Sequence, residues 1–397
     1  MATLFEPATL GPATLRNRFI KSATFEGATP DGVVTDALVE YHRKVAAGGA
    51  ALSTVAYLAV SPEGRTHAEC IHLRPEVVAG LRRLTDAIHA EGAAASAQIG
   101  HAGPVANAAS NGVPSIAPGR MFNPLGLRRT HAATEADIAR ITADFAAGAR
   151  RCVEAGFDVI EVHLGHNYLL SAFLSPKLNQ RTDRWGGSLE HRAQFARQVV
   201  LAVREAVDGE AAVIAKLNMS DGARGGTTID EAIQVARWLE EDGGLDALEL
   251  TGGSSLLNPM YLFRGAAPLP EFTATLPWYL RPGMRLVGKR FLRAYPYEEA
   301  YFLPSARKVQ AEVGLPIILL GGISRLETAR AAIDEGFAFV AMARALLNDP
   351  DLVNRFAAGE ADRSGCIHCN RCMPTIYTGT RCPLIDPRPG DRPVTAA

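Results

Sequence analysis

Hydrophobic and polar positions form two patterns that follow each other in turn along the chain. Short unbroken apolar runs are typical of strands buried on both faces, and longer segments with apolar residues at a period of about 3.6 indicate helices. The predicted strands are residues 17–23, 50–57, 93–99, 159–162, 211–217, 247–250, 316–320 and 337–342. The predicted helices are residues 38–47, 75–90, 134–155, 188–206, 228–241, 304–313 and 326–335.

This alternation predicts an α/β fold, a (β/α)8 TIM barrel rather than an open doubly wound sheet. No Gly-x-Gly-x-x-Gly opens a helix after the first strand, which argues against a Rossmann dinucleotide site. We expect residues 1–360 to form the barrel, with an insertion after strand six at about 255–300. Residues 361–397 are expected to form a Cys-rich C-terminal extension packed on the barrel. The insertion shows no clear periodicity and is expected to shape the substrate pocket.

Composition narrows the classes of partner. Hydrophobic residues make up 47% of the chain and charged residues 21%, as in a soluble globular protein. The net charge of −1 gives no reason to expect nucleic acid or an anionic membrane as a partner. Residues 1–7 lack the features of a signal peptide, and no apolar run approaches the roughly 20 residues of a membrane span. We therefore expect a cytoplasmic protein.

His163, His166 and Tyr168 directly follow the predicted fourth strand. In an α/β barrel this end of a strand carries the chemistry, because the loops there converge over the barrel axis. Two imidazoles can donate hydrogen bonds to one oxygen, and a phenol can donate a proton to a neighbouring carbon. Each residue alone fits a polar group that caps a strand, but the His-x-x-His-x-Tyr cluster favours a catalytic role.

Two further groups of residues stand at predicted strand ends. Gly321, Gly322, Ala343 and Arg344 follow strands seven and eight, where barrels commonly bind phosphate through backbone N–H groups and a helix N-terminus. Arg344 would add a bidentate partner. The alternative is turn glycines and a solvated arginine, and the pattern does not separate a flavin phosphate from a sugar phosphate.

Gln98 and Lys216 close strands three and five. An amide and a cation at these positions can bind the pyrimidine edge of a flavin ring, where the cation would stabilise negative charge during reduction. A satisfied core amide and a structural ion pair explain the same residues equally well, so the sequence leaves both interpretations open.

The chain resembles the Old Yellow Enzyme family of FMN-dependent ene reductases, within the wider NADH:flavin oxidoreductases. The resemblance spans residues 17 to about 350. The matching stretches are Asn17-Arg18, residues 97–103, 161–170, 173–176, 179–183 and 186–190, Gly321-Gly322 and Ala343-Arg344.

This resemblance implies a barrel that holds FMN at the C-terminal ends of its strands and receives electrons from NADH or NADPH. It implies that His163 and His166 bind the carbonyl or nitro oxygen of an activated alkene, and that Tyr168 supplies the proton. The cofactor contacts that it implies are Ser22, Ala23, Thr24, Ala56, Gln98, Lys216, Gly321, Gly322, Ala343 and Arg344.

Three positions depart from the family pattern. Phe25 occupies the place of a threonine or cysteine near the reactive edge of the flavin, so either Thr24 takes that role or the flavin is tuned differently. Lys216 replaces the usual arginine, which is not an equivalent donor. Ala343 replaces the usual glycine before Arg344, which would make the backbone approach to phosphate less close.

Four of the six cysteines lie near the C-terminus, at Cys366, Cys369, Cys372 and Cys382. Four thiolates can hold a [4Fe–4S] cluster or a structural zinc ion. The spacing resembles the cluster motif of the dienoyl-CoA reductase and trimethylamine dehydrogenase branch, although its last interval is shorter here. A thiol-rich tail without a cluster is the alternative.

We therefore expect an FMN-dependent oxidoreductase that reduces activated C=C bonds of small molecules with NADH or NADPH. One alternative is an iron–sulfur flavoenzyme fed by an external electron carrier, and another is a flavin-binding sensor without turnover. A third is a non-redox sugar-phosphate aldolase or isomerase. For that class Lys216 would be the only lysine at a strand end, with no paired acid evident. The oligomeric state stays open, a homo-oligomer included.

Overall fold

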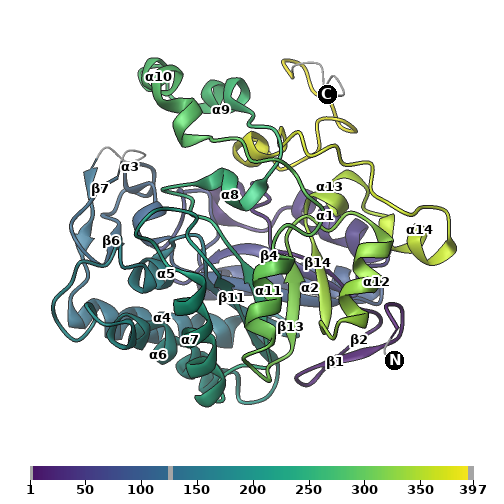
Figure 1. Ribbon diagram of the computed structural model, residues 1–397, viewed down its shortest axis with the longest axis horizontal. Coiled ribbons are helices and arrows are strands. Elements are labelled where there is room, and N and C mark those ends of the chain that lie inside the picture. Colours follow the sequence, from purple (N-terminus) through teal and green to yellow (C-terminus); the bar gives the residue numbers. More distant parts are fainter. Residues whose placement is uncertain (1–2, 124–127, 392–397) are drawn as a thin grey trace.

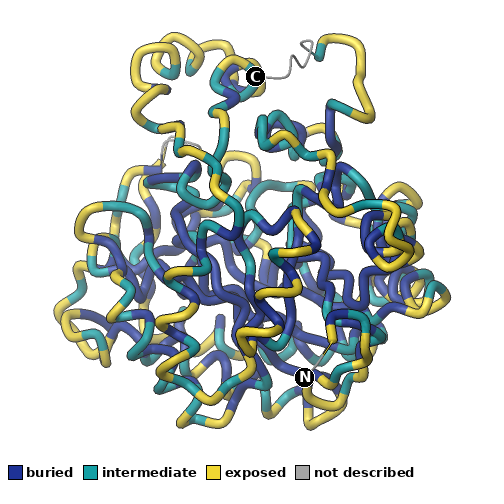
Figure 2. Tube along the Cα trace, turned by 45° about the vertical axis from the view of Figure 1, so that its right-hand side comes forward, coloured by how far each residue is buried: buried dark blue, intermediate teal, exposed yellow. Residues whose placement is uncertain are grey.

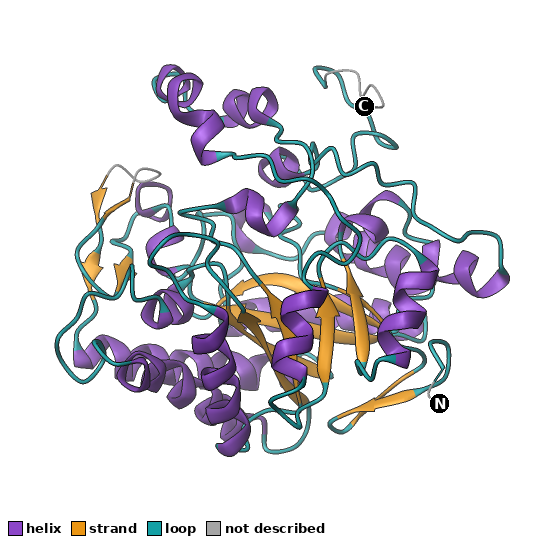
Figure 3. Cartoon of the chain, in the orientation of Figure 1, coloured by secondary structure: helices purple, strands orange, loops and turns teal. Residues whose placement is uncertain are grey.

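The computed structural model describes residues 3–123 and 128–391, and within them eight parallel strands close into a barrel. Figure 3 shows these strands at the centre of the molecule with helices around them. The predicted (β/α)8 fold is confirmed, with strand ends shifted by at most two residues. The barrel strands are β3 (Phe19–Lys21), β4 (Leu52–Ala59), β5 (Ala94–Gly100), β10 (Val159–Leu164), β11 (Ala212–Asn218), β12 (Ala247–Thr251), β13 (Ile317–Leu320) and β14 (Phe339–Met342).

Two of the helices around the barrel, α4 and α7, start where their capping residues predict. Thr134 and Thr228 accept hydrogen bonds from the third residue of α4 and α7, and Asp137 and Glu231 complete both capping boxes. The main helices are α1 (Asp36–Ala47), α2 (Val78–Ala90), α4 (Glu135–Glu154), α6 (Leu189–Val207), α7 (Ile229–Glu241), α11 (Leu303–Gln310), α12 (Leu326–Asp334) and α14 (Leu352–Ala358). None of the helices in the described ranges combines the length and the apolar character needed to cross a membrane.

Short elements complete the described chain. An N-terminal hairpin packs Leu10 and Leu15 against the inward-facing residues of the barrel, and its three-residue strands were too short to predict. The short strands are β1 (Ala8–Leu10), β2 (Ala13–Leu15), β6 (Ile116–Ala117), β7 (Phe122–Asn123), β8 (Arg128–Arg129) and β9 (His131–Ala132). The short helices are η1 (Pro30–Gly32), η2 (Pro75–Val77), η3 (Gly103–Val105), α3 (Ala108–Asn111), α5 (Leu169–Leu174), α13 (Arg344–Asn348) and η4 (Met373–Tyr377).

The insertion after β12 contains three helices, although its sequence shows no clear periodicity. They are α8 (Pro259–Phe263), α9 (Leu269–Thr275) and α10 (Arg281–Phe291). Figure 1 places α9 and α10 above the C-terminal ends of the strands, next to the C-terminal tail. Met260 and Leu292 of the insertion pack with Met373 of the tail. In Figure 2 these parts form lobes with much exposed surface above the buried barrel, and the expected division at residue 360 stays a prediction.

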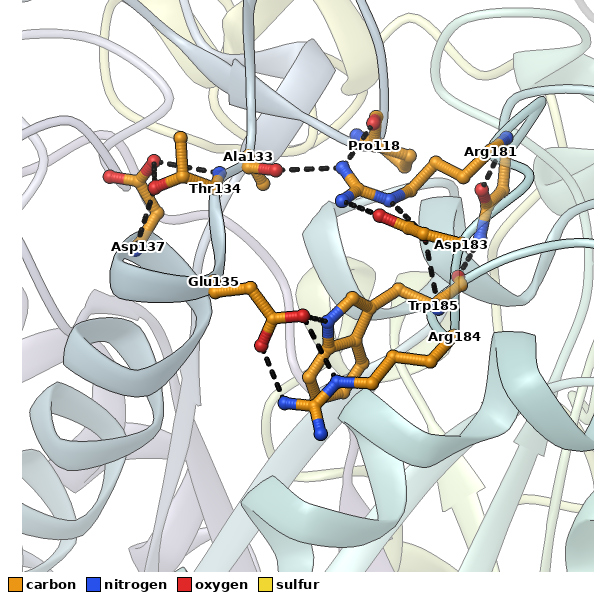
Figure 4. Close-up of polar contacts among 10 residues, drawn as sticks. Pro118, Ala133, Thr134, Glu135, Asp137, Arg181, Asp183, Arg184 and Trp185 are labelled. Atoms are coloured by element: carbon orange, nitrogen blue, oxygen red, sulfur yellow. Dashed lines mark hydrogen bonds and ion pairs between the residues drawn. The ribbon is translucent and has the colours of Figure 1, made fainter.

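The segment 179–190, which includes two stretches of the family resemblance (179–183 and 186–190), has a structural role (Figure 4). The Arg181 guanidinium donates to the backbone oxygens of Pro118 and Ala133 at 3.0 and 2.7 Å. Trp185 Nε1 donates to Glu135 at the start of α4, at 2.9 Å. These bonds fasten the segment after α5 to the neighbouring loop and helix, so the stretch supports the barrel rim.

Candidate active site

His163, His166 and Tyr168 come together at the end of β10, as the sequence predicts. The His163 ring centroid lies 5.0 Å from that of His166 and 4.6 Å from that of Tyr168. Tyr57 of β4 joins them, with its ring edge-on to Tyr168 at 5.3 Å. Sequence reasoning missed Tyr57, since nothing in its own strand marks an aromatic ring that points at a neighbouring strand.

A sharp backbone turn places Tyr168 beside His163. His166 and Asn167 both have positive φ, at 59° and 58°, which is uncommon for residues other than glycine. The buried Asn167 donates to Asp221 at 3.0 Å, and the backbone N–H of His166 donates to Asn218 at 3.3 Å. These bonds to the loop after β11 hold the strained turn in place.

The proton positions of the two histidines follow from their neighbours. The backbone N–H of Gly165 can only donate, so His163 Nδ1 accepts it at 3.3 Å and the proton of His163 lies on Nε2. His163 Nε2 then donates to His166 Nδ1 at 3.4 Å, and His166 Nε2 donates to the hydroxyl of Thr251 at 3.0 Å. The resting site therefore has one N–H between the two rings rather than two.

Both histidines are neutral near pH 7. Burial, with the other ring and the Lys216 cation adding to it, holds the pKa of His163 well below its usual range. Burial and the Lys216 cation lower the pKa of His166 to about 3. A neutral imidazole donates through one nitrogen and accepts through the other, so these rings can orient an oxygen atom without carrying a charge.

We expect His166 to make the fold less stable as the pH falls below 6.5. The folded pKa of about 3 lies below the ordinary value of 6.5, so the unfolded chain binds more protons between these values. Relative to a His166→Asn variant, the wild type should lose about 1.4 kcal/mol of unfolding free energy per pH unit over most of this window. Urea unfolding of both proteins at several pH values measures the effect. Parallel pH dependences would contradict it.

Lys216 and Gln98 lie in a buried network with two carboxylates from neighbouring strands. Lys216 Nζ contacts Glu161 at 3.0 Å and Glu249 at 2.7 Å. Gln98 donates to Glu161 at 2.5 Å, and Ser22 donates to Glu249 at 2.6 Å. The network contains the ion pair and the satisfied amide that the sequence left open, and it also keeps a cation inside the barrel mouth.

The charges in this network perturb one another. Burial would lower the pKa of Lys216, but the carboxylates of Glu161 and Glu249 outweigh burial and raise it. Burial raises the pKa of Glu161 to about 7, and the nearby Glu249 carboxylate acts in the same direction. A Schiff-base lysine needs a lowered pKa, so Lys216 does not suit an aldolase.

Two expectations about the barrel mouth were wrong. Lys216 does have paired acids, and Lys21 is a second lysine, at the end of β3, with Glu26 at 2.5 Å. The signal for the acids was present in the sequence, since Glu161 and Glu249 interrupt otherwise apolar strands. A charged residue at the inward position of a buried strand needs a partner inside the barrel.

Thr24 is hydrogen-bonded to the carboxylate of the second ion pair, Lys21–Glu26. Its hydroxyl donates to Glu26 at 2.7 Å, while Phe25 packs in one cluster with Ala56, Tyr57 and Tyr168. Ala23 belongs to the same apolar cluster. This arrangement argues against Thr24 as the substitute for the missing polar residue and favours an apolar wall at that position.

The loops after β13 and β14 lie close together, as the expected phosphate site requires. One of its expected donors, the N-terminus of α12, is occupied by a carboxylate of the chain itself. The Glu299 carboxylate accepts the N–H groups of Ser324 and Arg325 at 2.6 and 3.0 Å, so the N-terminus of α12 is already bound. Gly321 and Gly322 precede it with positive φ of 119° and 78°. The glycine N–H groups and the start of α13 are then the backbone donors left for a phosphate.

Arg344 begins α13 and binds two other parts of the chain. Its Nη1 donates to the backbone oxygen of Arg264 at 3.0 Å and to Asn370 Oδ1 at 2.5 Å. A guanidinium has five N–H donors, so these bonds leave donors on its other nitrogens. Ala343 directly precedes it as the N-cap of α13.

All four C-terminal cysteines have free thiols. Burial raises the pKa of Cys366, and it raises that of Cys372 to about 12. Within residues 3–123 and 128–391, no three His, Cys, Asp or Glu side chains gather closely enough to hold a metal ion. The thiols suit a cluster chemically, but they are not assembled as its ligands. The expectation of a cluster or zinc at Cys366, Cys369, Cys372 and Cys382 stays a prediction.

The comparisons of this chain with a family model and with curated proteins point to the same family. Residues 3–248 match the family model described as NADH:flavin oxidoreductase / NADH oxidase. The chain is 55% identical over 384 residues to a 4,4'-dithiodibutanoate disulfide reductase of Rhodococcus erythropolis, covering 97% of this chain and 95% of that protein. It is 31% identical to the multifunctional alkene reductase/demethylase OYE of Caballeronia cordobensis, over 93% of this chain.

Solved structures agree with this comparison. A 2-naphthoyl-CoA reductase in complex with 2-naphthoyl-CoA superposes with a TM-score of 0.83 at 25% identity, covering 97% of this chain. The present chain spans 57% of that protein and 51% of the alkene reductase, so it corresponds to about half of each.

The residues present fit the cofactor of this family. A phosphate would find the donors of Arg344 and of two glycines, and the buried Arg264 Nε has no hydrogen-bond partner among the described residues. A flavin ring would find the apolar cluster that includes Phe25 and Ala56, as well as a buried cation at Lys216. The chain belongs to the NADH:flavin oxidoreductase / NADH oxidase family, with FMN as its cofactor and NADH or NADPH as the reductant.

Proposed function

We propose that this protein reduces activated alkenes, such as α,β-unsaturated carbonyl or nitro compounds. The observation that carries the proposal is the grouping of two neutral histidines and one phenol at the end of β10. Such a set can hold a carbonyl or nitro oxygen and deliver a proton nearby without a charged acid. The similarity to an alkene reductase supports the same substrate class.

In the proposed reaction each side chain has a distinct role. Bound FMN would supply the hydride transfer from NADH or NADPH to the alkene. Arg344, Gly321 and Gly322 would hold the cofactor phosphate, and Gln98 and Lys216 would bind its ring. His163 Nε2 donates to the substrate oxygen.

His166 can add a second bond to that oxygen only through its other tautomer. With the proton on Nδ1, its Nε2 would accept from the Thr251 hydroxyl, which now accepts from it at 3.0 Å. A hydroxyl can reverse its role in this way, so Thr251 allows the change of tautomer.

Tyr168 is the proton donor in this proposal. The hydroxyl of the neighbouring Tyr57 donates a hydrogen bond to the backbone oxygen of Gly64 at 2.8 Å. Burial raises the pKa of Tyr57 well above its usual value, and the charges that Cys70 and Tyr168 could carry act in the same direction. Tyr57 therefore orients the ring of Tyr168, and Tyr168 gives its proton to the α-carbon.

A second candidate substrate class is the linear disulfide. The disulfide reductase that is 55% identical covers nearly the whole chain, which favours this class. In that reaction reduced FMN, when bound, would supply the two electrons that cleave the S–S bond, and Tyr168 would protonate one leaving thiolate. The second thiolate would take its proton from water.

One experiment separates the two classes. Enzyme reduced anaerobically with NADH or NADPH is mixed with 2-cyclohexenone or with 4,4'-dithiodibutanoate, and the return of the oxidised flavin absorbance is followed. We expect rapid reoxidation by the enone. Reoxidation by the disulfide alone would replace the first proposal with the second, and no reoxidation by either would contradict both and indicate a flavin-binding sensor.

A further inference from the structure

The C-terminal tail reaches the candidate phosphate site through one buried side chain. Asn370, 1% exposed, stands between Cys369 and Cys372. Its Oδ1 accepts the 2.5 Å hydrogen bond from Arg344, and its Nδ2 donates to the backbone oxygens of Arg264 and Ala266 at 3.1 and 3.0 Å. One amide thus joins the tail, the insertion and the arginine that follows β14.

Asn370 also fixes the direction of Arg344. The Arg344 Nη1 group binds Asn370 Oδ1 and the oxygen of Arg264, and Asn370 Nδ2 binds that same Arg264 oxygen. The three bonds form a closed triangle, which holds a long and flexible side chain in one orientation. Without it, Arg344 would regain the rotamer freedom that a phosphate would then have to remove.

A second residue of the tail, His368, is linked through Tyr297 to the loop after β13, the other candidate phosphate loop. The His368 ring stacks on Tyr297, with ring centroids 3.3 Å apart and planes inclined by 8°. The Tyr297 hydroxyl lies 2.7 Å from the backbone oxygen of Gly322 and 2.6 Å from Glu299 Oε2, and its single proton can be donated to either acceptor. The stacked pair therefore links His368 of the tail to the backbone of the loop after β13.

The insertion is shaped to receive the tail. Gly265 has a φ of 114°, and a Cβ atom there would lie 2.3 Å from the backbone oxygen of His368. The neighbouring Ala266 N–H donates to this oxygen at 3.2 Å. Only glycine allows the two backbones to approach this closely, so the contact between tail and insertion is built into the local sequence.

We propose that residues 368–370 of the tail hold the two phosphate loops in place, and that Asn370 is a positioning residue for the cofactor phosphate. The inference rests on the phosphate role given above to Arg344 and to Gly321 and Gly322. It gives the Cys-rich tail a function in cofactor affinity that needs no metal. The tail braces the loop after β14 through Asn370 and the loop after β13 through His368.

The test compares FMN with riboflavin, which has the same ring but no phosphate. Purified apoprotein of each variant is titrated with either flavin, and binding is followed by quenching of flavin fluorescence. Asn370→Leu should weaken FMN binding by about 10- to 100-fold, the size of a lost bond to a charged group, with riboflavin binding little changed. Asn370→Asp keeps an acceptor for Arg344 but loses the donor to the oxygens of Arg264 and Ala266 and adds a negative charge beside the phosphate site, so it should also lose the preference for FMN.

Two controls make each outcome informative. Ile367→Ala alters an exposed side chain of the same tail, 42% accessible, and should bind both flavins as the wild type does. Arg344→Ala should lose the preference for FMN. If Arg344→Ala keeps it, the phosphate assignment itself is wrong. If Arg344→Ala loses it and Asn370→Leu keeps it, only the role of the tail is refuted. Equal weakening of both flavins by Asn370→Leu would show a merely structural role and would also refute the proposal.

Discussion

Tyr168→Phe is expected to slow reoxidation of the reduced enzyme by 2-cyclohexenone about 10²- to 10⁴-fold, the usual contribution of a positioned general acid. Reduction of the flavin by NADH or NADPH needs no proton from this residue and should change little. Phenylalanine keeps the ring that packs against His163 and Tyr57 at 4.6 and 5.3 Å. Anaerobic stopped-flow measurement of the two half-reactions checks the prediction.

The matched control is Tyr57→Phe, which removes a neighbouring phenol of the same cluster. The Tyr57 hydroxyl donates to the backbone oxygen of Gly64 and transfers no proton in the proposed reaction. Reoxidation by the enone should therefore slow by less than about tenfold. Equal slowing in both variants would mean that the cluster acts through packing. An unchanged oxidative rate in Tyr168→Phe would remove Tyr168 as the proton donor.

Lys216→Met is expected to destabilise the fold by about 3–5 kcal/mol, because it leaves two buried carboxylates without their cation. Glu161 and Glu249 are both inaccessible to solvent and are both within 3.0 Å of Lys216 Nζ. Urea unfolding monitored by circular dichroism measures the loss. The apoprotein is suitable, since the expected effect comes from the charges alone.

The control for this prediction is Glu161→Gln, which removes one of the two negative charges around Lys216. Two carboxylates share one ammonium group, so Glu161→Gln should change stability far less than Lys216→Met does. In the double variant, Glu161→Gln should restore part of the stability that Lys216→Met removes. A single Lys216→Met variant as stable as the wild type would show that the carboxylates are protonated or hydrated in the fold.

Much of the barrel could be predicted, because each strand and helix carries its own periodicity. The segment around Val159–Leu164 is an unbroken buried strand, and the Thr134 and Thr228 caps mark where α4 and α7 begin. These signals are local, since they depend on residues within one or two turns of each other. The helices of the insertion escaped prediction because they are short, and α10 contains Pro282, Gly283 and Gly288, which weaken the helical pattern.

In the candidate site, too, residues with a local sequence signal could be predicted and residues with distant partners could not. His163, His166 and Tyr168 could be found because they lie within six residues of each other, at the end of β10 and in the turn that follows it. Tyr57 and Asn370 could not be assigned, because each meets its partner across a large separation in sequence. Asn370, for example, lies 26 positions after Arg344 and 106 after Arg264. For Glu249 the sequence shows that a buried charge needs a partner, but not which residue provides it.

The sequence by itself determined the order of strands and helices, the end of the barrel that carries chemistry, and the three ring residues at its centre. Only the tertiary structure decided which charges meet inside the barrel, which proton each histidine carries, and what holds Arg344. The physical reason is that periodicity and capping act between neighbours along the chain. Hydrogen bonds, ion pairs and pKa values depend instead on what barrel closure brings together and shields from water.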